Sequence, residues 1–303
     1  MSGLLIVLAT TALAAPALQD GRQPAAAVEE PAVSAQPPLP GQPFQRHSLE
    51  VTLVAGVWLP RMVGTTALGG DPIRVNDEFD LNANEPTLNV ELTIRKDEIW
   101  DLWFGGFAFS TDVSAAFGGS TQTFGSLVIN NGDAYTASLD MTSVAVELSV
   151  ALWRPYADGH TRAMGARNRT HDGRYITDLR FSPQFGMRYV DVDQSVTTAG
   201  GTENTGGEWL AVYAGMMLEL NCRPEDRIPG LELFQIQASF AAGPALGGDG
   251  GTMWQVRAGI KVQLTEMFGV TIAYRLVQLN ADNGPYTLNG GLQGLFLAGS
   301  FRF

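Results

Sequence analysis

Residues 143–152 read Ser-Val-Ala-Val-Glu-Leu-Ser-Val-Ala-Leu, with a large apolar side chain at every second position. Successive side chains of an extended strand point to opposite faces, so this spacing gives one apolar face and one polar or small face. A buried helix face would instead repeat every 3 to 4 residues. The stretch therefore predicts a β-strand with two chemically different sides.

The same alternation recurs along the chain after residue 47. We expect ten strands, at residues 48–60, 86–96, 99–111, 136–153, 175–190, 208–220, 231–243, 252–264, 269–280 and 291–303. Most exceed the ~5–6 residues of a typical strand and match the ~9–11 needed to cross a bilayer. Residues 99–111 (IWDLWFGGFAFST) indicate a strand by composition, but the phase of their alternation is ambiguous.

The expected connections alternate between long and short. The long ones, rich in Gly, Asn, Asp and Thr, are 61–85, 112–135, 191–207, 244–251 and 281–290. The other side has turns at 97–98, 221–230 and 265–268, although 154–174 is long and departs from the pattern. Long outer loops with short periplasmic turns are typical of outer-membrane barrels, and an even strand number is their rule. We therefore predict an all-β fold, a transmembrane antiparallel up-and-down barrel of about ten strands (eight to twelve allowed).

Composition agrees with this fold and excludes other classes. Of the 303 residues only 17% are charged, 35 are Gly, and the formal net charge is −12. The acidic balance argues against a nucleic-acid partner, which needs clustered Lys and Arg. A single cysteine, Cys222, excludes a disulfide framework or a CxxC metal site within the chain. No run of ~18 apolar residues occurs, so we expect no transmembrane helix.

The last strand carries a pattern that resembles the recognition signal which bacterial outer-membrane barrels present to their assembly machinery. The chain ends in an aromatic residue with apolar residues at alternate upstream positions: Leu295, Leu297, Phe301 and Phe303. Aromatic residues near strand ends suggest interfacial girdles, with Trp58, Trp100, Trp103, Tyr175, Trp209 and Tyr286 as candidates.

Two short segments carry a family resemblance. Residues 55–60 (Ala-Gly-Val-Trp-Leu-Pro) and 185–193 (Phe-Gly-Met-Arg-Tyr-Val-Asp-Val-Asp) resemble small outer-membrane barrels of the OmpA/OmpW-like superfamily. The resemblance implies membrane anchoring, adhesion or slow diffusion of small solutes. This chain departs from the family in suggesting ten strands rather than eight and in lacking a peptidoglycan-binding domain after the barrel, so specific activities do not transfer.

The alternation places charged residues on the inward face of the predicted barrel. They are Glu50, Glu91, Arg95, Glu147, Asp178, Arg180, Arg188, Glu219, Arg257, Lys261, Arg275 and Arg302. Buried charges are tolerated when paired, so we expect ion pairs that narrow or plug the lumen. The excess of bases leaves open an alternative, a narrow pore that favours anions.

The long loops hold most of the negative charge. Asp77, Glu78 and Asp80 offer hard oxygen ligands for divalent cations, but their spacing is not that of an EF-hand. A solvated acidic loop is the preferred interpretation, and we expect no cofactor.

The N-terminal residues indicate export. Residues 1–15 contain a short apolar stretch followed by Ala-Leu-Ala, which predicts a signal peptide, although no Lys or Arg precedes it. Residues 16–46 are rich in Pro and Ala and predict a disordered linker before a barrel at 47–303. Expected partners are outer-membrane lipid, periplasmic chaperones and the barrel assembly machinery.

Catalysis is not expected. The three histidines, His47, His160 and His171, lie outside the predicted outer loops, and no GxSxG motif occurs. The sequence thus predicts an outer-membrane barrel with a structural or surface role or slow passage of small solutes. The alternative is a secreted soluble β-sandwich that acts as a binding module.

Overall fold

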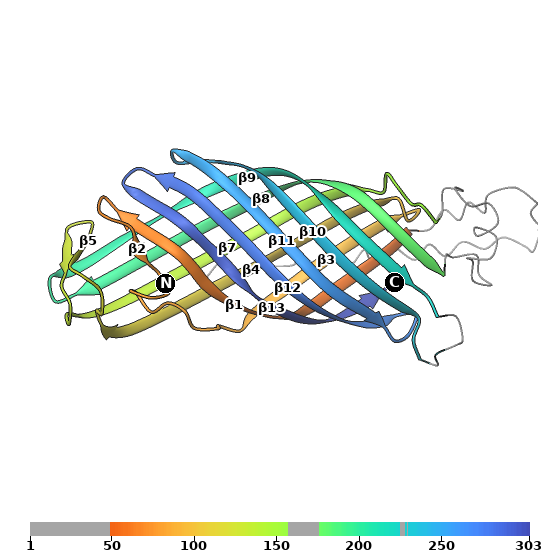
Figure 1. Cartoon of the computed structure of the whole chain (residues 1–303), viewed down its shortest axis with the longest axis horizontal. Helices are drawn as coiled ribbons and strands as arrows, with labels where there is room; N and C mark the ends of the chain where they lie inside the picture. The colour runs from red at the N-terminus through yellow and green to blue at the C-terminus, as the bar shows by residue number, and fades with distance from the viewer. Residues whose placement is uncertain (1–48, 157–175, 225–227, 229) are drawn as a thin grey trace, which may run out of the picture. The chain divides into compact units, whose positions relative to one another are not determined.

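A computed structural model describes residues 49–156, 176–224, 228 and 230–303 (Figure 1). The predicted signal peptide, the linker, and Tyr175, His47, His160 and His171 lie outside these residues. Among the described residues, no helix is long and apolar enough to cross a membrane.

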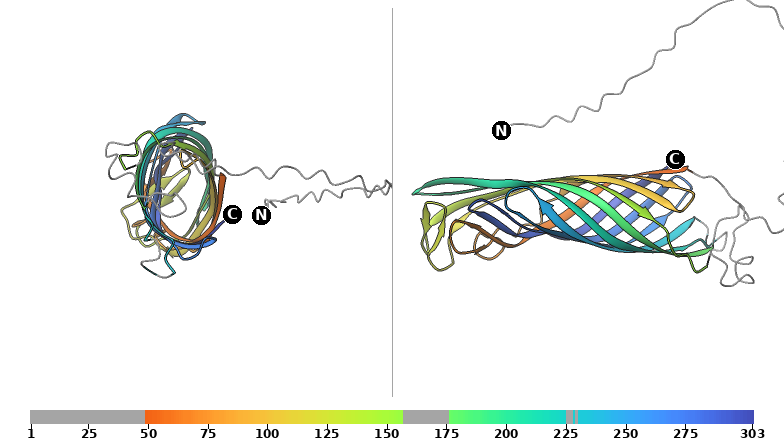
Figure 2. Two further views of the ribbon diagram at one scale, coloured as in Figure 1. Left: turned by 90° about the vertical axis from the view of Figure 1, so that its right-hand side faces the viewer. Right: turned by 90° about the horizontal axis from the view of Figure 1, so that it is seen from above.

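Ten long strands form one antiparallel sheet that closes on itself. They are β1 (Leu49–Leu68), β3 (Thr87–Lys96), β4 (Trp100–Ala116), β7 (Ala134–Val150), β8 (Thr177–Thr198), β9 (Gly201–Cys222), β10 (Leu233–Leu246), β11 (Gly250–Gln263), β12 (Phe268–Asn283) and β13 (Tyr286–Arg302). Each pairs with its neighbour in the sequence, and β13 pairs with β1 from Thr52↔Arg302 to Leu68↔Tyr286. The view along the axis shows the closed ring (Figure 2). The predicted ten-stranded up-and-down barrel is confirmed, and the β-sandwich alternative is wrong because one sheet closes rather than two sheets stacking.

Exposed apolar side chains form a belt around the outside. On β8 the outward residues from Leu179 to Tyr189 are apolar, and on β9 those from Leu210 to Leu220 are also apolar. Each run covers about the 9–11 residues that a tilted strand needs to cross a bilayer. Only lipid accommodates so continuous an apolar surface around a closed barrel in which each long strand pairs with two neighbours, so the barrel spans a membrane.

The strands continue well past this belt, and there the pattern inverts. On β8, the outward residues after Tyr189 include Asp191 and Asp193, while Val190, Val192 and Val196 are buried inside. On the side of the inversion that holds Leu49 and Arg302, apolar side chains face lipid and polar ones face the lumen. On the other side, polar side chains face water and apolar ones fill the interior. The wall is a membrane barrel at one end and a water-exposed barrel at the other.

This inversion corrects several predicted loops. Residues 191–207 and 281–290 are mostly strand, and β8–β9 and β12–β13 end in tight turns at 199–200 and 284–285. The segments 61–85, 112–135 and 244–251 also begin or end as strand. Gly, Thr, Asn and Asp are frequent in these segments and therefore predict loops, yet the β8–β9 and β12–β13 backbones pair up to their turns.

The inversion also explains the ambiguous phase of residues 99–111. Trp100 and Phe104 face outward, whereas Phe107 and Phe109 are buried inside, so apolar residues occupy both phases of one strand. Most of the predicted girdle is wrong for the same reason. Trp58, Trp209 and Tyr286 are 1% exposed and fill the interior, Trp103 faces the lumen, and Trp100 alone of the described candidates is exposed outside.

A small cap lies at the end of the barrel opposite Leu49 and Arg302, the first and last strand residues (Figure 1). It contains β2 (Ile73–Arg74), which pairs with β1, and the hairpin of β5 (Gln122–Phe124) and β6 (Leu127–Ile129). Four aromatic rings form its centre, with Phe79 lying 5.8–6.3 Å from Phe117, Phe124 and Tyr135. We call this end the cap end, and the end with Leu49 and Arg302 the termini end (Figure 1).

Candidate functional site

The charged half of the lumen lies at the termini end. All twelve charged residues predicted to face inward lie on the inward face of their strands, and Asp178, Arg180 and Glu219 are 1% exposed. The structure sorts most of them into separate ion-pair clusters rather than one continuous ladder.

The most buried cluster is a closed ring of two arginines and two carboxylates. Arg95 contacts Asp101 at 2.6 Å and Glu219 at 2.9 Å, and Arg180 contacts the same two carboxylates at 3.2 and 3.0 Å. Asn221 and Gln235 each donate a further hydrogen bond to Glu219, at 2.6 and 2.7 Å. The charges balance within the ring, which is the condition for tolerating them in a low-dielectric interior.

A second cluster surrounds Glu147. Its carboxylate pairs with Arg257 and accepts hydrogen bonds from Tyr213 at 3.0 Å and Gln255 at 2.9 Å. Arg257 also stacks over the ring of Trp103, 4.6 Å from its centroid. The same Gln255 accepts a hydrogen bond from Arg188. Arg188 therefore joins the cluster through Gln255, and no ion pair is found for it among the described residues.

Two pairs complete the wall. Arg275 pairs with Glu91 and lies 3.4 Å from the centroid of the Phe296 ring. Arg302 pairs with Glu50 at 3.7 Å, close to the termini end.

A further cluster lies at the termini end, and sequence reasoning missed most of it. Arg154 contacts Asp178 at 2.7 Å and Glu98 at 2.8 Å, and Arg223 contacts Glu98 at 3.7 Å. Burial raises the pKa of Glu98, but attraction to Arg223 and Arg154 outweighs it, so this pKa lies below its ordinary value. Glu98 has a positive φ of 55° in the tight β3–β4 turn, a conformation costly for a residue with a Cβ.

The missed residues had weak signals. Asp101 belongs to the strand of ambiguous phase, and Glu98, Arg154 and Arg223 follow strand ends, where alternation no longer assigns a face. The residues predicted to face the lumen include more bases than acids. A search of the strands for further acids that could pair with these bases would have pointed to Asp101.

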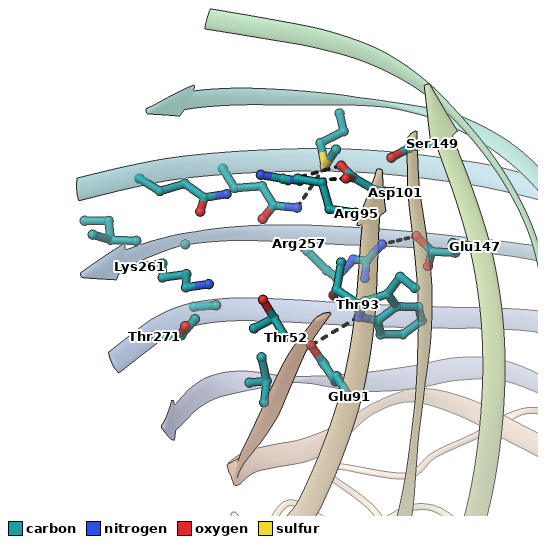
Figure 3. A pocket seen from close by; sticks show the side chains of 18 of the residues that line it. Thr52, Glu91, Thr93, Arg95, Asp101, Glu147, Ser149, Arg257, Lys261 and Thr271 are labelled. Atoms are coloured by element: carbon teal, nitrogen blue, oxygen red, sulfur yellow. Dashed lines mark hydrogen bonds and ion pairs between the residues drawn. The ribbon is translucent and has the colours of Figure 1, made fainter. Parts of the chain in front are cut away.

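These clusters enclose a cavity of about 170 Å³, which we call the vestibule (Figure 3). It extends from the strand ends at the termini end, where Glu50, Glu98, Arg223 and Arg302 line it, to a floor of Glu91, Trp103, Glu147, Arg257, Arg275 and Phe296. Beyond the floor lies a void of about 20 Å³, with room for about one water molecule.

From the floor toward the cap end, apolar side chains fill the interior. Trp58, Met62, Phe296 and Leu292 are 0–1% exposed, and the ring of Trp58 packs edge-on against Phe107 at 5.0 Å. Among the described residues, these apolar side chains, which we call the apolar plug, lie between the vestibule and the cap end.

The other candidate residues lie apart from the lumen. Leu295, Leu297 and Phe301 face outward in the belt. Phe303 exchanges backbone hydrogen bonds with Val51 at 2.9 and 3.3 Å, which extends the closing seam by one residue.

The predicted acidic loop carboxylates are engaged locally. Glu78 accepts a hydrogen bond from the backbone of Arg74, Asp77 contacts the Arg74 side chain at 3.5 Å, and Asp80 accepts one from Asn82. In the part of the chain that the structure describes, no group of three or more His, Cys, Asp or Glu is arranged to hold a metal ion.

No family model matches the chain, and no curated protein matches it. Among solved structures, it is similar to Ail, the attachment invasion locus protein of Yersinia pestis, at 10% identity and a TM-score of 0.31, covering 84% of this chain and 98% of that one. It is also similar to the translocator domain of the autotransporter NalP from Neisseria meningitidis, at 12% identity and a TM-score of 0.36, covering 84% and 87%. An outer membrane channel from Pseudomonas putida F1 matches at 10% identity and a TM-score of 0.27, covering 86% and 98%. Because these identities and TM-scores are low, the assignment of the fold rests on the strand pairing alone. Membership of the OmpA/OmpW-like superfamily stays a prediction.

Proposed function

We propose that this chain is a non-catalytic outer-membrane barrel of a Gram-negative cell envelope, with a closed lumen and a structural or surface role. Its termini end faces the periplasm and its cap faces the cell exterior, the orientation usual for even-stranded barrels. Outer-membrane lipid, periplasmic chaperones and the barrel assembly machinery are its partners, and an OmpA/OmpW-like ancestry is part of the proposal.

The observation that carries the closed lumen is the apolar plug. Trp58 and Phe296 are register partners on β1 and β13, and both point inward with 1% and 0% of their surface exposed. A conducting pore needs a continuous polar path, whereas the interior of a barrel of about eight strands is just wide enough to be filled by side chains or to hold one small ligand. The plug therefore favours a closed barrel over an anion-selective pore.

The experiment compares the plug with a matched pair on the outer face. Purified wild-type protein in planar bilayers should show no conductance steps above detergent controls. The variant Trp58→Ala with Phe296→Ala should open discrete steps, because two large rings leave the lumen. The variant Leu59→Ala with Leu295→Ala removes a register-paired set from the lipid face and should stay silent.

Folding of each variant is checked by heat-modifiable migration on gels, which also tests the membrane barrel itself. Wild-type conductance would reject the closed lumen and favour the narrow pore instead. Recovery of the protein in the aqueous phase without detergent would reject the membrane assignment.

A further inference from the structure

Lys261 stands out among the charged side chains of the vestibule. It lies on β11 between its register partners Gln235 on β10 and Thr271 on β12, and projects into the vestibule (Figure 3). Its inward neighbours Gly259 and Ala273 are small, which leaves open space beside its ammonium group.

The charge balance of the chamber identifies Lys261 as the excess cation. The described lining has five carboxylates (Glu50, Glu91, Glu98, Asp101, Glu147) and six cations (Arg95, Arg223, Arg257, Lys261, Arg275, Arg302). Each of the five arginines forms an ion pair with a carboxylate. Within the described lining, Lys261 is the one cation for which no ion pair is found. A net charge of about +1 therefore resides on one ammonium group.

The remaining lining favours a ligand with an apolar body. Val54, Met217, Leu233 and Trp103 contribute apolar surface, and Thr52 and Thr271 contribute hydroxyl groups. The volume of about 170 Å³ is similar to the ~150 Å³ of an engineered cavity that holds benzene. There is thus room for one ring-sized molecule.

We propose that the vestibule binds a small organic monocarboxylate, entering from the termini end, with its carboxylate on the Lys261 ammonium group and its apolar body against Val54, Met217 and Leu233. One unpaired cation matches one negative charge. A multivalent anion such as phosphate is disfavoured, because its extra charge would face the five wall carboxylates. The proposal deepens the proposed function, since it rests on a closed lumen that makes the chamber a binding site rather than a passage.

The sequence provides a selective probe, because its two lysines are Lys96 and Lys261. Lys96 is exposed at the end of β3 and serves as the internal control. Reductive methylation with ¹³C-formaldehyde preserves the charge and gives each lysine an NMR signal, which Lys261→Gln and Lys96→Gln assign. Cyclohexanecarboxylate is titrated at constant ionic strength, with neutral cyclohexanecarboxamide and inorganic phosphate as comparisons.

We expect the carboxylate to shift the Lys261 signal saturably while the Lys96 signal stays fixed. The amide and phosphate should leave the Lys261 signal unchanged over the same concentrations. Calorimetry should show a Kd about tenfold or more weaker for Lys261→Gln, the loss expected for one charge-assisted hydrogen bond, and unchanged for Lys96→Gln. Lys261→Gln is first checked for heat-modifiable migration.

Equal shifts with the amide, parallel shifts of both lysines, a stronger response to phosphate, or no saturable response in the folded wild type would each overturn the proposal. Bilayer recordings on the same preparation separate it from the closed lumen. A silent barrel that fails to bind rejects the carboxylate site alone, whereas a conducting barrel that binds rejects the closed lumen and keeps the site.

Discussion

Replacing Arg180 with methionine should destabilise the barrel by about 3–5 kcal/mol, the range for breaking a buried ion pair from one side. Arg180 is 1% exposed and contacts both Asp101 and Glu219. Its removal leaves these two carboxylates to share the single guanidinium of Arg95, so the interior carries an uncompensated negative charge. Methionine keeps most of the volume, which separates the charge effect from a cavity effect.

A second variant tests whether charge balance is the cause. Arg180→Met combined with Glu219→Gln removes one charge of each sign and leaves the Arg95–Asp101 pair at 2.6 Å in place. The double variant should be more stable than Arg180→Met alone, because it leaves no uncompensated charge in the interior. Arg61→Met, at an exposed outward position of β1, should change stability by less than about 0.5 kcal/mol.

The assay is urea unfolding of protein refolded into lipid vesicles, read by tryptophan fluorescence and by the folded fraction on unboiled gels. A cost below about 1 kcal/mol for Arg180→Met would refute the closed ring, since water would then be solvating Asp101 and Glu219. A double variant less stable than the single one would refute the charge-balance argument.

Three further predictions follow from the turns, the seam and the chain end. Deleting Phe303 should lower the amount of folded protein in the outer membrane in vivo, while unaided refolding in detergent is less affected; unchanged membrane levels would contradict an assembly role. Burial raises the pKa of Glu98, but the combined attraction of Arg223 and Arg154 lowers it below its ordinary value of 4.5. The contribution of Glu98 to stability is therefore full above pH 4.5 and is lost as pH falls through the lowered pKa. Glu98→Gln should therefore be less stable than wild type at neutral pH, and urea titrations below pH 4.5 should show the difference shrinking; a gap that widens in acid would contradict this sign. Gly294→Ala should block closure, because a Cβ there meets the facing β1 backbone, whereas Gly299→Ala should fold normally because its nearest neighbour would be 3.6 Å away; equal yields of heat-modifiable protein would argue against a tight seam.

Much of the barrel could be predicted because lipid imposes a simple rule on sequence. Where β8 crosses the belt, from Leu179 to Tyr189, the alternation predicts both the strand and which of its side chains point to lipid. Past Tyr189 the solvent changes from lipid to water, so the apolar phase moves to the even positions. A search for one uninterrupted alternation fails across such a junction, which is why the sequence predicts loops where the strands continue.

The lumen was predictable in kind but not in arrangement. Alternation placed Glu147, Arg257 and the other charges inside, because a charge on the lipid face is costly. Which charges meet depends on strand tilt and shear, which bring Arg95 on β3 to Glu219 on β9 across 124 residues of sequence. The sequence does not predict the apolar plug. Trp58 and Trp209 lie near the ends of expected strands, where interfacial tryptophans also lie, so their positions do not show that they point inward.

The cap end gives the protein a second, independent folding environment. Phe79, Phe117, Phe124 and Tyr135 pack on a wall whose outer face is wetted, so their association follows the hydrophobic effect in water. Helices or strands immersed in hydrocarbon gain little from that effect, and their stability comes from backbone pairing and packing. Urea and cooling both weaken the hydrophobic stabilisation of side chains that are buried away from water. Both should therefore loosen the cap before the belt. The molecule is thus expected to open from its exterior tip in a separate cooperative step, while the membrane-embedded ring stays intact.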